Sequence, residues 1–234
     1  SIAFMVYKPV QREIFAADFS DRVVHHLIYR CIYQDHIDPF LIPDSYSCRK
    51  GKGTLHGAKR LNYFIKSCSS NYKQDAYILK LDISGYFMNM SHSILYNKVI
   101  KFLNPNIRYL GLDYATLNFL LQKTIFTNVA LDCKIKGNQS NWKTLPKDKS
   151  LFSKPKGIGL PIGNLTSQIF GNIFLNEIDY FIKNTLKMQY YGRYVDDMVF
   201  VHKDKNVLKK AIPLIQAELN KIGLTIHPKK IYLQ

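Results

Sequence analysis

Three aspartates, at two places in this chain, are the side chains best suited to chemistry. Asp196 and Asp197 stand side by side within the apolar and aromatic stretch 189–202, and Asp82 lies near the end of the apolar stretch 76–83. Stretches of this composition are typical of buried strands. Carboxylates held together between such strands are costly to bury unless cations neutralise them, so the pattern indicates a divalent metal site. The adjacent pair alone is explained equally well as an ordinary turn, because aspartate bonds its own backbone there. The second acidic strand end, at Asp82, favours the metal site over an ordinary turn.

Three carboxylates meeting at one edge of a sheet would allow two-metal phosphoryl transfer, in which ions about 3.5–4 Å apart hold the attacking and leaving oxygens. Nucleotidyl transferases and metal-dependent nucleases share this chemistry. The spacing of the acidic positions does not choose between the two classes. A dependence of the activity on deoxynucleoside triphosphates would distinguish a nucleotidyl transferase from a nuclease.

The overall charge points to a polyanionic partner. The 234 residues include 33 Lys and Arg against 17 Asp and Glu, which gives a net charge of +16. Tyr and Phe are abundant as well and could stack on bases, so nucleic acid is favoured over the alternative of a generally basic soluble protein. The 47% hydrophobic content is enough for a sizeable core in one large domain or two small ones.

The cysteines and histidines give no sign of a zinc site. The four cysteines lack Cys-x-x-Cys spacing, and the seven histidines form no zinc pattern with them. We therefore expect reduced, packing cysteines in a cytoplasmic protein. The sequence has no signal-peptide pattern and no apolar run of about 18 residues, so no membrane partner is expected.

Hydrophobic periodicity predicts the elements that must position these side chains. Residues 132–157 are polar and lysine-rich and are predicted to be an irregular, solvated excursion. In the first half of the chain, the patterns predict a hairpin of strands 2–7 and 13–17 with its bend at 8–12, a helix from Asp18, a helix capped at Thr54 and reaching Cys68, and a strand over 76–83. They then predict helices over 91–103 and 113–125 and a long helix after the turn 157–164 reaching Ile182. The last elements are a strand hairpin over 189–202, a helix over 205–221 bent or broken near Pro213, and a short strand over 224–227. This order does not alternate as a parallel α/β fold would, and it predicts an α+β fold with an antiparallel sheet backed by helices.

The motifs and their order resemble those of the reverse transcriptases over nearly the whole chain. Tyr194-Val195-Asp196-Asp197 resembles the catalytic Tyr-x-Asp-Asp box, and the segment 81–87 resembles the preceding motif, with a metal-binding aspartate and an aromatic residue five positions later. That aromatic, Phe87, would act as a steric gate against the ribose 2′-hydroxyl; core packing is its alternative role. The resemblance implies two Mg²⁺ ions, for which Mn²⁺ could substitute.

The resemblance also implies roles for basic residues. Arg12, with Lys8 as a second candidate, would meet the incoming triphosphate, and the loop 45–53 would follow the template backbone, although as a generic loop it lacks P-loop spacing. Lys230, with Lys229 as its rival, would protonate pyrophosphate, or else it is a solvated lysine. In full, the implied catalytic residues are Asp82, Asp196, Asp197 and Lys230; the metal-binding residues Asp82, Ile83, Asp196 and Asp197; the nucleotide-binding residues Arg12, Lys8, Tyr86, Phe87, Ile162 and Gly163; and the nucleic-acid-binding residues Arg49, Lys50, Lys52 and Tyr194.

One motif departs from the commoner family pattern. Most reverse transcriptases carry Pro-Gln-Gly before the long helix, whereas this chain has Pro161-Ile162-Gly163, and the continuation through Ser167-Gln168 replaces Ser-Pro. This combination is similar to the error-prone reverse transcriptases of diversity-generating retroelements, which copy a template RNA with frequent errors opposite adenine. Ile162 cannot donate the hydrogen bonds of a glutamine amide, so discrimination against a misaligned base pair would weaken.

The resemblance implies right-hand polymerase fingers over 1–75, to which part of 104–157 could contribute, and a palm over 76–234. The primer-gripping strands and helical thumb of the family are absent from these residues, so we expect weak retention of primer and template by this chain alone. Implied partners are an RNA template, a DNA or RNA primer, dNTPs and an accessory protein. The alternatives are a group II intron-type, retron or phage-defence reverse transcriptase, a metal-dependent nuclease, and a non-catalytic nucleic-acid-binding relic of the fold.

Overall fold

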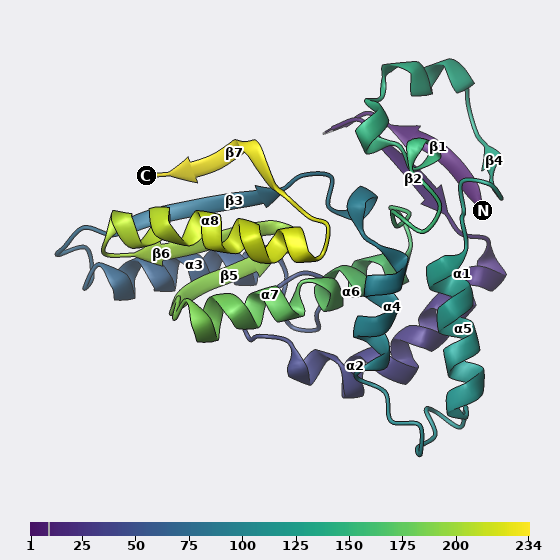
Figure 1. Cartoon of the computed structure of the whole chain (residues 1–234), viewed down its shortest axis with the longest axis horizontal. Coiled ribbons are helices and arrows are strands. Elements are labelled where there is room, and N and C mark those ends of the chain that lie inside the picture. The colour runs from purple at the N-terminus through teal and green to yellow at the C-terminus, as the bar shows by residue number, and fades with distance from the viewer. Residues whose placement is uncertain (9) are drawn as a thin grey trace. The chain divides into compact units, whose positions relative to one another are not determined.

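The computed structural model describes residues 1–8 and 10–234; Pro9, within the predicted hairpin bend, lies outside the described residues. The chain divides into two compact units, the first formed by 1–40 and 87–174 and the second by 41–86 and 175–234 (Figure 1). The chain therefore passes between the units three times, whereas the resemblance implies fingers over 1–75, to which part of 104–157 could contribute, and a palm over 76–234. The assignment of fingers and palm stays a prediction.

A three-stranded sheet with the order β2-β1-β4 belongs to the first unit. The antiparallel hairpin predicted at the N-terminus is confirmed: β1 (Ile2–Val6) pairs with β2 (Arg12–Ala16), with Ile2 opposite Ala16. The short strand β4 (Lys134–Ile135) joins β1 in parallel, so a segment distant in sequence completes this sheet.

Residues 132–157 are irregular and mostly exposed, as predicted, but the prediction of a wholly solvated excursion was wrong. Short 3-10 turns follow β4, and the side chains of Leu145 and Leu151 are buried. Leu151 packs with Ala3 and Phe15 of the hairpin and with Met88, and Trp142 packs against the same cluster. The apolar residues are spaced irregularly among lysines, so no periodic pattern reveals that they share one side. The turns span Gln139–Thr144, Lys147–Lys149 and Leu151–Ser153.

Glu13 of β2 links this segment to the hairpin through hydrogen bonds. It is buried, and its carboxyl group accepts hydrogen bonds from Trp142 Nε1 at 2.6 Å, Ser150 Oγ at 2.8 Å and the Leu151 backbone N–H at 2.8 Å. Glu13→Ala leaves three donors without an acceptor, so we expect about 3 kcal/mol less stability in urea unfolding and faster proteolysis within 139–153. Glu218→Ala, which removes only an exposed pair with Lys221, is the control and should cost under about 1 kcal/mol. Equal effects of the two substitutions would contradict this role for Glu13.

Helices make up the rest of the first unit, and α4 and α5 confirm two predicted helices with their caps. The Ser91 hydroxyl accepts from the Ile94 N–H at 3.4 Å, and the Asp113 carboxylate accepts from the Thr116 N–H at 2.7 Å, which satisfies donors that the first turn of a helix leaves free. The helical segments of this unit are α1 (Phe19–Ile28), a π-helical turn (Tyr29–Tyr33), α2 (Gln34–His36), 3-10 turns at Asp38–Phe40 and Phe87–Asn89, α4 (His92–Ile100), α5 (Tyr114–Phe126) and α6 (Leu165–Phe174).

The long helix predicted after residue 164 is three segments in the structure. Helix α6 ends at Phe174, Leu175 adopts φ −94° and ψ 0°, and α7 (Asn176–Tyr180) and a π-helical turn (Phe181–Thr185) follow. The prediction of one helix was therefore wrong. The apolar stripe continues through all three segments, so its period does not reveal the local change in backbone angles.

The second unit contains a four-stranded antiparallel sheet with the order β5-β6-β3-β7, which confirms the predicted fold class. Figure 1 shows β7 running beside β3. The strand predicted over 224–227 begins two residues later in the structure and continues to Leu233. Because β7 is an edge strand, most of its side chains are exposed and its basic residues hide the strand pattern; Pro228 is tolerated there for the same reason. The strands are β3 (Tyr77–Ile83), β5 (Tyr190–Tyr194), β6 (Asp197–His202) and β7 (Ile226–Leu233).

Two helix details correct the sequence prediction. Helix α3 (Thr54–Cys68) is preceded by Gly53, at φ +130°, as its N-cap, so Thr54 is the first helical residue and not the cap. Helix α8 (Lys205–Lys221) continues through Pro213 without a break. Both Pro213 and Lys209, whose carbonyl loses its helical partner, are exposed, so water can satisfy that carbonyl.

The two faces of this sheet have different surroundings, because successive side chains of a strand point to opposite sides. Leu79, Leu81 and Phe200 are buried on one face, which α7 and α8 cover. On the other face, Val201 packs with Phe64 of α3 at one end. Three polar side chains, of Lys80, Asp82 and Asp197, stand toward the opposite end of that second face and remain partly accessible.

Candidate functional site

The β5–β6 hairpin carries the acidic pair at its turn. Tyr194 and Asp197 are the last paired residues, so Val195 and Asp196 form a two-residue turn. Val195 has φ +56°, a left-handed conformation that is rare for a β-branched residue. The turn that carries Asp196 therefore holds Val195 in a conformation that other parts of the structure must stabilise.

The structure brings Asp82, Asp196 and Asp197 together, as the two acidic strand ends predict. The pKa of Asp196 is raised to about 6, first by burial and also by the negative charges of Asp82 and Asp197, although its own backbone N–H and Lys230 act in the opposite direction. Three carboxylates that influence one another at a strand turn form a site that attracts cations.

Two lysines contact the outer carboxylates of this group. Lys230 Nζ lies 3.0 Å from Asp82 Oδ2, and Lys80 Nζ lies 3.0 Å from Asp197 Oδ1. The hydrogen bond to Asp82 raises the pKa of Lys230. Sequence reasoning named Lys230 and missed Lys80, although Lys80 stands two residues before Asp82 on the same strand and so on the same face. Within the described ranges 1–8 and 10–234, no group of three or more His, Cys, Asp or Glu side chains is arranged to hold a metal ion as it stands.

A buried ion pair lies behind the turn, on the helix-covered face of the sheet. Arg193 Nη2 is 2.7 Å from Asp179 Oδ2, and both side chains have 0% exposure. Arg193 Nη1 also donates to the carbonyl of Val195 at 2.6 Å, and the Tyr191 hydroxyl donates to Asp179 Oδ1 at 2.6 Å. Sequence reasoning missed this network. The only signal was an arginine inside an otherwise apolar strand.

The family model described as reverse transcriptase (RNA-dependent DNA polymerase) matches residues 12–234. The chain belongs to the reverse transcriptase family. A search of curated protein sequences gave no match.

Solved structures similar to this chain include telomerases from two Candida species. Apo telomerase from Candida tropicalis truncated from its C-terminal domain aligns with a TM-score of 0.61 and 16% identity, covering 100% of this chain and 50% of that one. Telomerase from Candida albicans, in complex with a TWJ fragment of telomeric RNA, aligns with a TM-score of 0.59 and 12% identity, covering 100% of this chain and 41% of that one. At these identities the likeness shows the fold alone. This chain spans half or less of the length of the structures it matches.

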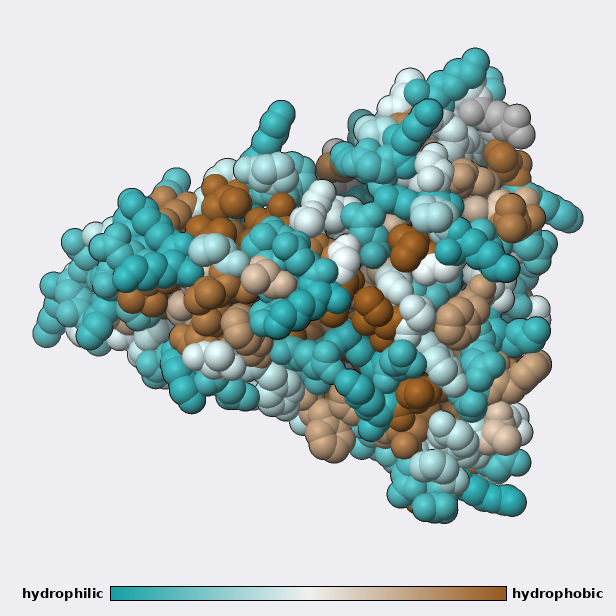
Figure 2. All heavy atoms as spheres, in the orientation of Figure 1, coloured by the Kyte–Doolittle hydropathy of each residue, from teal (hydrophilic) through white to brown (hydrophobic). Residues whose placement is uncertain are grey.

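No helix among residues 1–8 and 10–234 combines the length and the apolar character that a membrane crossing requires. Figure 2 shows hydrophilic side chains over much of the visible face, with hydrophobic groups in patches between them. Over the whole sequence, 33 Lys and Arg outnumber 17 Asp and Glu, which gives the net charge of +16.

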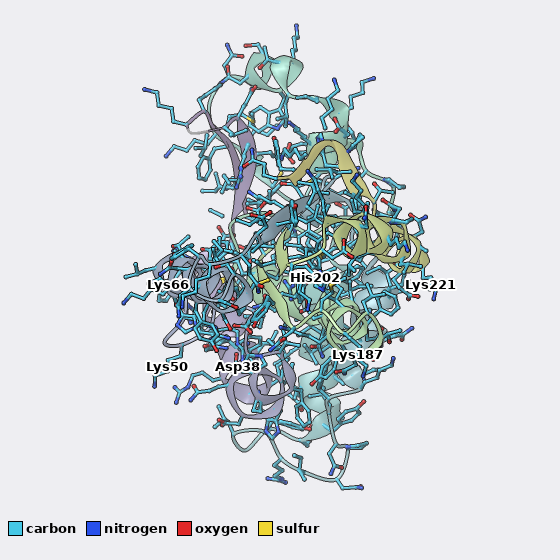
Figure 3. The ribbon with its side chains drawn as sticks, turned by 90° about the vertical axis from the view of Figure 1, so that its left-hand side faces the viewer. Asp38, Lys50, Lys66, Lys187, His202 and Lys221 are labelled. Carbon is cyan, nitrogen blue, oxygen red and sulfur yellow. The ribbon has the colours of Figure 1, made fainter. Side chains whose placement is uncertain are left out.

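The basic loop of the second unit uses two of its three predicted contact residues to hold its own backbone. Arg49 Nη1 donates to the carbonyls of Ile42 at 2.6 Å and Ser45 at 3.1 Å, and Lys52 Nζ donates to the Pro43 carbonyl at 2.5 Å. Lys50, labelled in Figure 3, is exposed. Of the three, Lys50 is the side chain most available to a phosphate.

The other residues predicted for the second unit differ in accessibility. Tyr194 is 38% exposed at the end of β5. Ile83 and Tyr86 are buried, and burial, with the charges of Asp196 and Asp179 adding to it, raises the pKa of Tyr86 well above its usual range. Contacts of Ile83 or Tyr86 with a metal or nucleotide would therefore have to come from the main chain.

In the first unit, the segment that carries Ile162 and Gly163 packs on the N-terminal hairpin. The Ile162 carbonyl accepts from the Phe15 N–H at 2.8 Å, and the Ile162 side chain packs against the cluster that contains Phe15. Gly163 has φ +124°, and a Cβ there would lie 2.9 Å from both Ile14 Cγ2 and the Phe15 carbonyl oxygen. The close approach to β2 is thus a reason within the chain for glycine at this position.

The remaining nucleotide contacts predicted by the family resemblance also lie in the first unit. Lys8 and Arg12 are exposed at the two sides of the hairpin bend. Phe87 begins a 3-10 turn, is half-buried, and its carbonyl accepts from the Leu160 N–H at 2.7 Å. Their roles stay predictions.

Proposed function

We propose that this protein is an RNA-directed DNA polymerase that copies a template RNA into cDNA by two-metal-ion nucleotidyl transfer. The observation that carries the proposal is the mutual influence of Asp82, Asp196 and Asp197 at the strand turn of a reverse transcriptase-family chain. The excess of basic residues supports nucleic-acid partners. A primer, dNTPs and an accessory protein complete the proposed partners. The proposed compartment is the cytoplasm, where the four free cysteines would stay reduced.

The donor set suits Mg²⁺, which prefers carboxylate oxygens. Asp82 and Asp196 would hold two ions, and Asp197 and the backbone of Ile83 would support them. When bound, the metal ions would supply Lewis-acid stabilisation of the phosphoryl oxygens. To bind them, Asp82 and Asp197 would exchange the ammonium groups of Lys230 and Lys80 for metal.

Lys230 is suited to hold a proton near the departing pyrophosphate. Its contact with Asp82 raises its pKa and keeps it protonated, and its side chain is 49% exposed, so it is free to reorient. The contact with Asp82 favours Lys230 over Lys229, because neighbouring residues of β7 point to opposite faces of the sheet. Proton transfer from a positioned lysine would assist departure by the general-acid route.

The finer proposal is a diversity-generating retroelement enzyme, supported by Pro161-Ile162-Gly163 and by Gln168. If Ile162 is responsible for errors at template adenines, Ile162→Gln should lower the misincorporation frequency there, because an amide would restore polar contacts to the base pair. Sequencing of products made on one template by each variant measures this. Ile162→Met, which keeps the volume and the apolar packing, should leave the spectrum unchanged. An unaltered spectrum in the glutamine variant would point to a group II intron-type, retron or phage-defence enzyme instead.

The proposed activity is tested by dNTP incorporation on an RNA template with an annealed DNA primer. We expect extension that requires Mg²⁺ and dNTPs and that the Asp196→Asn/Asp197→Asn double variant lacks. Degradation of the template without dNTPs would indicate a nuclease. Tight, salt-sensitive RNA binding without extension would indicate a non-catalytic nucleic-acid-binding protein.

A further inference from the structure

We propose that Arg193, anchored by Asp179, is a positioning residue that sets the geometry of the turn bearing Asp196. This inference rests on the proposed function, since it concerns how the carboxylates of that site are held. Neither residue would touch substrate or metal. Both act through the backbone of the turn.

The contacts of Arg193 connect a helix to this turn. Its Nε and Nη2 donate to the carboxylate of Asp179 at 2.9 and 2.7 Å, so the guanidinium plane is fixed by a two-point contact with α7. The remaining arm, Nη1, reaches the carbonyl of Val195 at 2.6 Å. That carbonyl belongs to the peptide bond that leads directly into Asp196.

The backbone of Arg193 is fixed as well. Its N–H donates to the Asp44 carbonyl at 2.8 Å, and its own carbonyl accepts from the Tyr46 N–H at 3.0 Å. In the next strand, its partner in register is Met198, one residue beyond Asp197. The guanidinium therefore reaches the turn from a rigid base.

The turn needs such support because Val195 is in a left-handed conformation at φ +56°. That conformation costs a β-branched residue roughly 1–3 kcal/mol and persists only where the surroundings impose it. Beside the strand pairing of Tyr194 with Asp197, the hydrogen bond from Arg193 to the Val195 carbonyl is a contact that can hold the turn in this conformation. Without this bond the turn could relax, and Asp196 would move relative to Asp82.

A role in stability alone does not account for this ion pair. Two charges at 0% exposure lose their hydration, so apolar residues of similar volume are often as stable as a buried pair. A planar, forked guanidinium is instead suited to contacting two acceptors in a fixed geometry. Here the two acceptors are the Asp179 carboxylate and the carbonyl beside the acidic pair.

The test compares the wild-type protein with the Asp179→Asn/Arg193→Met double variant. This variant removes both charges together, keeps an acceptor for the Tyr191 hydroxyl and leaves the Val195 carbonyl without its donor. Leu219→Ala, a substitution of a buried residue in α8, is the matched control for lost stability. For each protein, we would measure thermal unfolding, Mn²⁺ affinity by electron paramagnetic resonance without nucleic acid, and kcat and KM for dNTP incorporation.

We expect the double variant to fold, to bind Mn²⁺ about 10- to 100-fold more weakly than wild type, and to lose kcat with little change in KM for dNTP. Leu219→Ala should lose stability and keep wild-type Mn²⁺ affinity. Should the double variant fail to fold, Tyr191→Phe/Asp179→Leu/Arg193→Met, which replaces the whole buried network with apolar side chains, should show the same weakened Mn²⁺ binding. A folded variant with wild-type Mn²⁺ affinity would overturn the inference.

The Mn²⁺ measurement separates this inference from the proposed function. If the wild-type protein incorporates no dNTP but binds Mn²⁺ in a manner that Asp196→Asn abolishes, the proposed activity fails while the positioning role is still measured by the double variant. If Asp196→Asn leaves Mn²⁺ binding unchanged, there is no metal site for Arg193 to position, and the inference is overturned.

Discussion

Asp196→Asn should reduce Mg²⁺-dependent dNTP incorporation at least about 1000-fold, because an amide cannot supply the charge that holds the cations, and metal ions stabilise the transition state by several kcal/mol. Asp196 is the central carboxylate, close enough to Asp82 and Asp197 for both to raise its pKa. Single-turnover extension of an annealed primer on an RNA template measures the change. The substitution should not destabilise the fold, since it removes repulsion among three carboxylates.

Asp204→Asn is the matched control. Asp204 caps α8 by accepting from the Asn206 N–H at 2.8 Å, and asparagine caps a helix about as well as aspartate. This variant should therefore extend the primer at the wild-type rate. Comparable activity of Asp196→Asn and wild type would contradict the assignment of the acidic turn as the catalytic centre.

Gly163→Ala should lower the stability of the protein by about 2–4 kcal/mol, which corresponds to a Tm about 5–15 °C lower for a chain of this size. Alanine is strained at φ +124°, and its Cβ would lie 2.9 Å from the backbone oxygen of Phe15, which cannot move aside as a flexible side chain could. Thermal unfolding followed by circular dichroism measures the effect.

Gly111→Ala separates the two causes of this loss. Gly111 also has a positive φ, +85°, but a Cβ there would meet nothing within 4 Å. We therefore expect Gly111→Ala to cost about 1–2 kcal/mol from backbone strain alone. Equal losses at the two glycines would show that the approach of the 161–163 segment to β2 contributes nothing to stability.

Two lysines at the acidic site balance the negative charge of the neighbouring carboxylates. Lys80 and Lys230 are each 3.0 Å from a carboxylate oxygen, and both are partly exposed, so they can leave at little cost. Residues at this site thus divide into two groups. In the proposed function, the exposed lysines give way to metal ions, while the buried Arg193–Asp179 pair stays in place.

The sequence by itself determined the elements whose signals are local and periodic. The alternating or apolar runs around Asp82 and around Asp196–Asp197 predicted β3 and the β5–β6 hairpin, and Ser91 and Asp113 marked the starts of α4 and α5. Strand period and helix capping depend on neighbouring residues, so they can be read without knowing what packs above them. The same local motifs sufficed to identify the family.

Only the tertiary structure decided which distant residues share a site. Lys80 became part of the acidic cluster because β3 and β6 pair in a register that places it beside Asp197, and Arg193 became a support of the turn because α7 carries Asp179 to the back of β5. Likewise, the burial of Leu151 on the hairpin and the extension of β7 depend on partners far along the chain. Contacts of this kind arise from strand register and helix placement, which no local pattern of residue types encodes.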